Sequence, residues 1–155
     1  NYSFINEPQY DQMSKEFFNI FNEIRTNPGK FIEESKEHNL FEIFIKLKPC
    51  PDLKYCENDV NKLKKYIMKS YLKNKSVSDQ EKEIKILINE NIKEICLFQS
   101  ISFSNNIKEN IWHFLEENED DIEKIFDIKY NSLMIISIPL EHNVKILLNL
   151  IFYKE

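Results

Sequence analysis

The stretch LMIISIPLEHNVKILLNLIFY, residues 133–153, decides the fold class of this chain. It consists of two long apolar runs, 133–140 and 144–153, which are joined by the short polar segment 141–143. Ile-rich and Leu-rich runs with so short a connection predict two neighbouring antiparallel strands that form a β-hairpin. The chain is therefore expected to end in a sheet, and the rest of the sequence must supply what covers that sheet.

Helical patterns dominate the chain before this hairpin. Residues 14–25 and 57–73 carry apolar side chains three and four positions apart, which is the spacing of one face of an α-helix. Apolar and polar side chains alternate at 98–103, which predicts a further strand. Other helices are expected at 30–38, 81–96, 106–117 and 120–126, whereas 40–47 fits either a helix or a strand. Helices followed by a hairpin predict the α+β class, with the helices packed on an antiparallel sheet.

The composition fits a single folded domain. The chain has 155 residues, 42% of them hydrophobic, which is enough to bury one core. We expect an N-terminal arm over residues 1–12 and one domain over 13–155. With 26 acidic residues against 21 basic ones, the net charge of −5 argues against a nucleic-acid partner. No run approaches the roughly 20 apolar residues of a membrane span, so we expect a soluble monomer.

The three cysteines, Cys50, Cys56 and Cys96, leave two possibilities open, namely three thiols or one disulfide and one thiol. No CxxC pair and no His at zinc-finger spacing accompany them, which argues against a zinc module. The chain contains a single Gly, so the Gly-rich loops that bind phosphates and the Gly-x-Ser-x-Gly turn of hydrolases are excluded. We therefore expect no cofactor.

Five segments follow one another in the order of a known pattern. They are FNIFNEIRTNP (18–28), PDLKYC (51–56), ENI (90–92), ENIWHF (109–114) and DIKYNSLMI (127–135). Together they resemble the CAP superfamily of cysteine-rich secretory, antigen 5 and pathogenesis-related-1 proteins, with the bacterial SCP-like branch closest in appearance. The resemblance spans about 13–155, and it implies a three-layer α-β-α sandwich with a central antiparallel sheet.

The resemblance also implies a cleft with two His and two Glu, which in many members coordinates a divalent metal. The two His positions fall on Ile67 and near Asp120 or Asp121, so neither imidazole is present. The two Glu positions fall on Glu90 and Glu109, which retain their carboxylates. Two carboxylates without imidazoles make a poor zinc site, and calcium or magnesium usually requires more oxygen donors. We therefore expect no bound metal.

The three histidines do not obviously replace the missing ligands. His113 lies four residues after Glu109, so the two share a helix face and form the one pair that could keep a ligand or an acid–base couple. His38 is expected to have a structural role near the end of a short helix, and His142 is expected in the hairpin turn. Any surviving cleft is expected between the helix of 57–73 and the sheet.

These observations predict a non-catalytic CAP-like domain that is secreted or displayed at the cell exterior and binds a host protein or a lipid- or sterol-like ligand. The chain has a single Arg among many Lys, abundant Asn and Ile, and no Ala. Combined with a bacterial-type CAP domain, this bias resembles spirochaete outer-surface lipoproteins of the Borrelia type, whose lipid-attachment cysteine would precede Asn1. Two alternatives are open. One is a metal-dependent hydrolase that uses Glu90, Glu109 and His113, and the other is a cytosolic interaction domain unrelated to CAP proteins.

Overall fold

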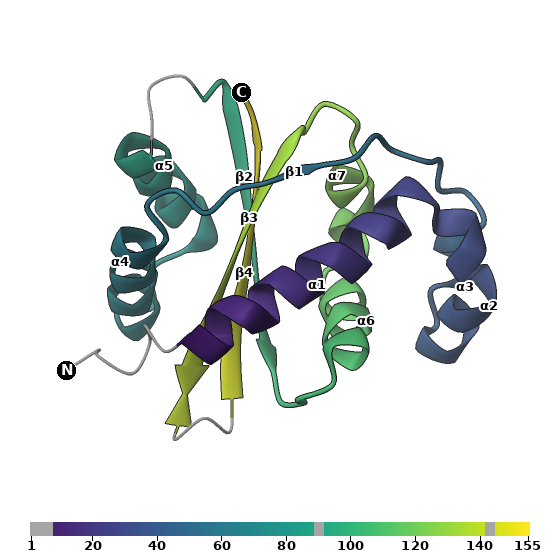
Figure 1. The fold of residues 1–155 in the computed structure, drawn as a ribbon, viewed down its shortest axis with the longest axis horizontal. Coiled ribbons are helices and arrows are strands. Elements are labelled where there is room, and N and C mark those ends of the chain that lie inside the picture. The colour runs from purple at the N-terminus through teal and green to yellow at the C-terminus, as the bar shows by residue number, and fades with distance from the viewer. Residues whose placement is uncertain (1–7, 89–91, 142–144) are drawn as a thin grey trace.

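A four-stranded sheet runs through the centre of the molecule, in the order β1-β3-β4-β2 (Figure 1). The structure is a computed structural model that describes residues 8–88, 92–141 and 145–155. The strands are β1 (Lys54–Tyr55), β2 (Glu94–Ser102), β3 (Ser132–Leu140) and β4 (Lys145–Lys154).

The predicted hairpin is confirmed, because β3 and β4 pair antiparallel from Ser132 opposite Tyr153 to Leu140 opposite Lys145. β4 also pairs antiparallel with β2, so it lies inside the sheet. The prediction of a purely antiparallel sheet is wrong in one respect, since β1 pairs in parallel with β3. A parallel pair needs a long crossover, and here the connection contains five of the described helices and β2. The fold is therefore α+β with a mixed sheet.

Helices precede and follow β1. Those before it are α1 (Pro8–Thr26), η2 (Pro28–Phe31), α2 (Ile32–Ser35), η3 (Lys36–His38) and α3 (Phe41–Phe44). Those after it are α4 (Val60–Leu72), α5 (Val77–Ile88), α6 (Ile107–Glu117), η4 (Glu119–Asp121) and α7 (Ile122–Ile125). α1 begins at Pro8, so its first turn uses residues that the sequence assigned to the arm. None of the described helices is both long and apolar enough to cross a membrane.

The helix predicted over 81–96 ends early. α5 ends at Ile88, and residues 94–96 belong instead to β2, where they pair with β4. The ambiguous segment 40–47 contains the short helix α3.

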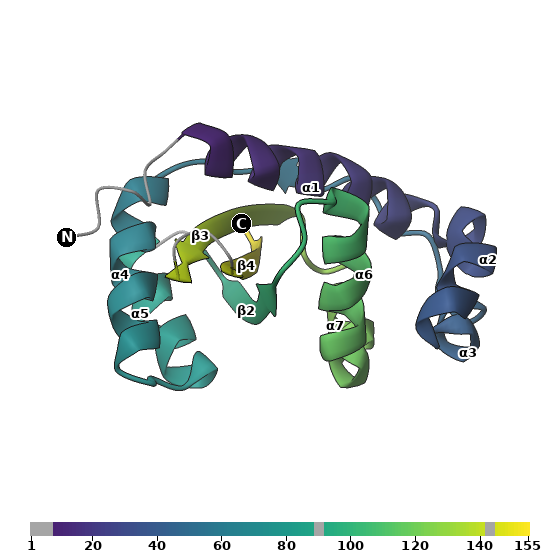
Figure 2. The ribbon, with the colours of Figure 1, turned by 90° about the horizontal axis from the view of Figure 1, so that it is seen from below.

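The hairpin is buried on both faces, which explains why its two runs are apolar throughout instead of alternating. Successive side chains of a strand point to opposite faces, and β3 accordingly divides its side chains between two apolar cores. The α1–α6 core includes Phe17, Phe21, Phe114, Leu133, Ile135 and Phe152. The α4–α5 core includes Leu63, Ile67, Ile84, Met134, Ile136 and Ile151. Figure 2 shows α4 and α5 on one side of the sheet and α6 and α7 on the other, with α1 crossing above.

The cysteines are free thiols, which resolves the question that the sequence left open. Cys50 and Cys56 are buried, and Cys96 is partly buried. Burial raises the pKa of Cys50, and it raises the pKa of Cys96 to about 11. A raised pKa keeps a thiol protonated and poorly nucleophilic near neutral pH. These two side chains therefore act as small packing groups.

Candidate functional site

The structure separates the residues that the sequence grouped into one cleft. Ile67 of α4 is fully buried in the α4–α5 core. Glu109 and His113 lie on α6, whose apolar side belongs to the α1–α6 core on the other face of the sheet. Glu90 lies outside the described residues. The structure thus brings Glu109 and His113 together and keeps Ile67 apart from them.

Glu109 and His113 line a hollow of about 290 Å³ at the start of α6, which we call the α6 hollow. Its other walls are Ser102, Phe103, Ser104 and Asn110. The Glu109 carboxylate accepts a hydrogen bond of 2.7 Å from Ser104 Oγ. His113 Nε2 lies 2.9 Å from the Ile101 carbonyl oxygen and 2.7 Å from Glu117 Oε1. His113 is therefore held by the edge of β2 and by the next turn of its own helix.

This geometry limits the chemistry of the α6 hollow. Both partners of His113 Nε2 are oxygen acceptors, so Nε2 carries a hydrogen and donates it. A ring nitrogen that carries a hydrogen has no lone pair for a metal, which leaves Nδ1 as the available ligand atom. Within the described parts of the chain, no group of three or more His, Cys, Asp or Glu side chains is placed to hold a metal ion. The α6 hollow offers one carboxylate and one imidazole.

The other predicted positions make local contacts. Asp121, near the second His position of the family, lies 3.5 Å from Lys124 Nζ. His38 stacks on Trp112 with ring centroids 4.8 Å apart, and its Nδ1 lies 2.7 Å from Glu116 Oε1. These contacts fasten the end of η3 to α6, in keeping with a structural role. His142 lies outside the described residues.

Two larger hollows flank the chain between β1 and α4, next to the sheet. The Asp11 hollow, of about 460 Å³, is lined by Asp11, Tyr55, Glu57, Asp59, Lys62 and Ile135. The Tyr153 hollow, of about 580 Å³, is lined by Lys54, Asn58, Asp59, Met134, Tyr153 and Glu155. Asp59 belongs to both, and its left-handed backbone (φ 61°) turns the chain into α4. The segment 56–59 therefore separates two hollows that share one wall.

Two side chains of α1 fix the chain that leads into these hollows. Arg25 is fully buried and donates to the Pro51 carbonyl oxygen at 3.1 Å. One turn earlier, Asn22 Oδ1 accepts a hydrogen bond of 3.1 Å from the Leu53 backbone N–H. These are the Asn and the Arg of the Asn-x-x-Arg segment. In this chain, the motif fastens the residues immediately before β1.

An ion pair between a buried lysine of α4 and the half-exposed Asp11 lies beside the Asp11 hollow, which the Asp11 side chain lines. Lys64 of α4 is fully buried, and its Nζ lies 2.6 Å from Asp11 Oδ1. A buried ammonium group needs such a partner, because an unpaired buried charge is strongly unfavourable. Burial also raises the pKa of Tyr55, and Glu57 and Asp11 raise it further. The Tyr55 hydroxyl therefore stays protonated and available to donate a hydrogen bond beside several carboxylates.

Asp11, Asp59 and Lys64 were not predicted from the sequence. One signal was present, since Lys64 follows Leu63 on the apolar face of its helix, where a buried lysine requires a partner of opposite charge. That partner is 53 residues away along the chain, in a segment that the sequence assigned to the arm. No local pattern indicates such a pairing.

In comparisons with known proteins, no family model, no curated protein and no solved structure matches this chain. No matching protein adds to the five sequence segments that resemble CAP proteins.

Proposed function

We propose that this chain is a non-catalytic, CAP-like binding domain that takes a protein partner at the Asp11 and Tyr153 hollows. The observation that carries the proposal is that two hollows flank one short segment, 56–59, whose charged residues are exposed. Binding sites commonly lie on exposed loops that a rigid scaffold holds in position. Here the sheet, α4 and the contacts of Asn22 and Arg25 provide that scaffold.

Kinship with CAP proteins is supported by the arrangement of the elements. Helices pack on both faces of a central sheet, as the three-layer α-β-α sandwich of that superfamily requires (Figure 2). The first helix of the described residues also carries the Asn-x-x-Arg segment, and the last two described strands form the expected hairpin. The parallel pairing of β1 is a departure from the antiparallel sheet that we expected.

A non-catalytic role is supported by the separation of the former ligand positions. Ile67 is an apolar core residue, Glu109 lines the α6 hollow, and Asp121 pairs with Lys124. A catalytic zinc normally needs three protein ligands around one point and an open position for water or substrate. These three positions lie on different elements and contact different residues, so they do not surround one point.

The lining of the hollows favours a protein over a lipid or a sterol. Small apolar ligands bind in pockets that are mostly apolar and that cover most of the ligand surface. Glu57 and Asp59 border the Asp11 hollow, and a sterol seated there would desolvate their carboxylates without compensation. A protein partner supplies basic side chains for these acids. Such a role suits a domain that is secreted or displayed at the cell exterior, and an export signal encoded upstream of Asn1 would test this location.

Retention of proteins from blood plasma on the immobilised chain tests the proposal. We expect the Glu57→Lys/Asp59→Asn variant to retain none of the plasma proteins that the wild-type chain retains, because the two substitutions remove the acidic side chains of segment 56–59. Asn tolerates the left-handed backbone of Asp59, so the fold is kept. The control Glu37→Lys/Glu42→Gln makes the same charge change on η3 and α3 and should retain them. Equal retention by all three proteins would contradict the proposal.

A metal-dependent hydrolase is the second candidate, since Glu109 and His113 do line one hollow. The test is metal analysis of the chain purified in the presence of zinc, combined with ester, peptide and phosphate hydrolysis assays. We expect no stoichiometric metal and no activity that Glu109→Ala removes. Bound metal and hydrolysis that are both lost in Glu109→Ala would replace the binding proposal.

A further inference from the structure

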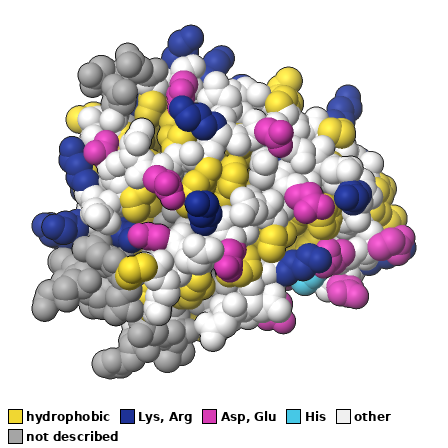
Figure 3. Space-filling view, viewed as in Figure 1, with side chains coloured by type: hydrophobic (Ala, Val, Ile, Leu, Met, Phe, Trp, Pro, Cys, Tyr) yellow, Lys and Arg dark blue, Asp and Glu magenta, His cyan; other side chains and the backbone are white. Residues whose placement is uncertain are grey.

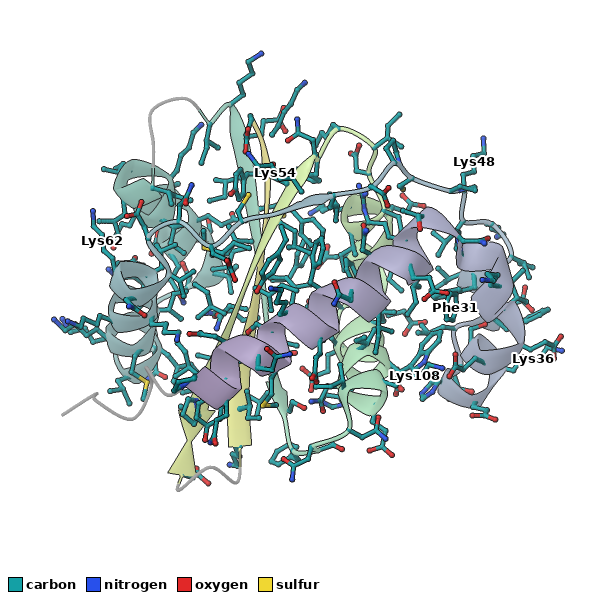
Figure 4. The ribbon with its side chains drawn as sticks, viewed as in Figure 1. Phe31, Lys36, Lys48, Lys54, Lys62 and Lys108 are labelled. Atoms are coloured by element: carbon teal, nitrogen blue, oxygen red, sulfur yellow. The ribbon has the colours of Figure 1, made fainter. Side chains whose placement is uncertain are left out.

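α4 and its C-cap carry a row of exposed lysines. Residues 60–75 contain six of the 21 basic residues of the chain and none of its 26 acidic ones. Four of these lysines are exposed and follow one another at intervals of three, four and four residues, so they project from one side of the helix. We call Lys62, Lys65, Lys69 and Lys73 the lysine face. Figure 4 shows Lys62 projecting from α4, and Figure 3 shows basic side chains along this edge of the molecule.

The lysine face differs from the other two lysines of the segment. Lys64 Nζ lies 2.6 Å from Asp11, and Lys75 Nζ lies 2.9 Å from Glu83. Among the residues that the structure describes, no carboxylate comes within 4.0 Å of an ammonium group of the lysine face. Four such charges within about 16 Å of helix produce a strong local positive potential. The lysine face is therefore a local positive region on a chain whose net charge is −5.

Apolar side chains accompany the lysine face. Ile86 on the outer side of α5 is 82% exposed, and Leu72 near the end of α4 is 58% exposed. A hollow of about 500 Å³ between the two helices is lined by Lys62, Lys65, Tyr66, Lys69 and Leu87. Cationic and apolar groups therefore reach solvent on the same helix pair.

We propose that the lysine face and Ile86 bind the surface of an anionic phospholipid membrane. Basic side chains are attracted to anionic headgroups, and exposed apolar side chains enter the boundary between the headgroups and the acyl chains. A nucleic acid or an acidic polysaccharide would use the lysines, but it would leave the exposed Ile86 and Leu72 without a role. The acidic remainder of the chain is repelled by the same membrane, so it orients the domain with the lysine face toward the lipid. This surface shares Lys62 with the Asp11 hollow but includes none of residues 56–59, so substitutions that leave Lys62 unchanged allow the membrane proposal and the protein-binding proposal to fail separately.

Cosedimentation with lipid vesicles tests the proposal. We expect the chain to bind vesicles of equimolar phosphatidylcholine and phosphatidylserine, and to stay in solution with phosphatidylcholine alone. Lys65→Gln/Lys69→Gln should lower the partition coefficient about 25-fold, which is about fivefold for each lysine. Lys62 is left unchanged because it also lines the Asp11 hollow. Equal binding of wild type and this variant would overturn the proposal.

The control Lys46→Gln/Lys48→Gln removes the same charge from exposed positions of the opposite end of the molecule, where Figure 4 labels Lys48. We expect this variant to bind the anionic vesicles as wild type does. An equal loss in both variants would mean that net charge alone governs binding, and it would overturn the assignment to the lysine face.

Ile86→Ser distinguishes a membrane from a soluble polyanion. We expect weaker binding to the anionic vesicles and an unchanged melting temperature, because the Ile86 side chain makes little contact with the fold. Heparin serves as the soluble polyanion. Binding to heparin that is as strong as binding to vesicles, together with no effect of Ile86→Ser on either, would overturn the membrane as the partner.

Discussion

Arg25 is the one arginine of the chain, and it ties α1 to two other segments through their backbone carbonyl oxygens. Its guanidinium donates to the carbonyl oxygens of Pro51 at 3.1 Å, Ile125 at 3.1 Å and Asp127 at 2.6 Å. A planar fork with five N–H donors can serve several acceptors at once, whereas an ammonium group is a single point charge. The last turn of α1 is thereby tied both to the residues before β1 and to the loop after α7.

Arg25→Lys should lower the free energy of unfolding by about 2–4 kcal/mol, because buried carbonyl oxygens lose their donors while the charge stays. Urea denaturation followed by the fluorescence of Trp112 measures this change. Lys30→Ala is the control, since it removes an exposed ion pair of 3.6 Å with Glu23 and should cost less than about 1 kcal/mol. An Arg25→Lys protein as stable as wild type would show that the hydrogen bonds of the Arg25 guanidinium are not needed for stability.

At the scale of elements, α4 and α5 are joined by a polar cluster at the surface. The Tyr66 hydroxyl donates to Glu83, and Lys75 Nζ lies 2.9 Å from both oxygens of the same carboxylate. The hydrogen bonds from Tyr66 and Lys75 lower the pKa of Glu83, and Glu83 raises the pKa of Lys75. The cluster therefore holds α4, which carries the lysine face, against α5, which carries Ile86.

This cluster predicts an acid-sensitive helix pair. The pKa of Glu83 is lower in the folded chain than its ordinary value of 4.5, so the contribution of the carboxylate is complete above 4.5 and is lost as the pH falls through the folded-state pKa. Hydrogen-exchange protection factors of α4 and α5, measured above and below that value, should fall on acidification. Glu83→Gln should remove this dependence, whereas Asp79→Asn on the same helix should keep it. The same acid dependence in Glu83→Gln would exclude Glu83 as its source.

Elements whose pattern is local were predictable, and elements that depend on distant partners were not. The helical spacing around Phe17, Phe21 and Ile24 correctly predicts most of α1. The spacing of apolar residues continues in the same way past Ile88, but residues 94–96 pair with β4, and this long-range ladder overrides the local pattern. β1 has only two residues, and it is defined by its pairing with β3 far along the chain.

At the scale of the whole molecule, the same limit applies to the candidate site. The two apolar runs correctly predict the hairpin, and the structure places an apolar core on each of its faces. The pairing of Glu109 with His113 on one hollow follows from helical spacing, whereas the Asp11 hollow needs α1, β1 and α4 to meet. Such a meeting is a property of tertiary structure, and a sequence read by local periodicity does not contain it.

The two cores share β3 and β4, so a loss of packing on one face should destabilise the other. Ile67→Ala should lower the free energy of unfolding by about 2–5 kcal/mol, because it leaves a cavity in the α4–α5 core. Trp112 is the only tryptophan and lies in the α1–α6 core, so its fluorescence reports on the opposite face. We expect the fluorescence and far-UV circular dichroism midpoints in urea to shift together, and the exposed Ile86→Ala to leave both within about 0.5 kcal/mol of wild type. A fluorescence midpoint that stays at the wild-type value while the dichroism transition splits would mean that the two faces of the sheet unfold independently.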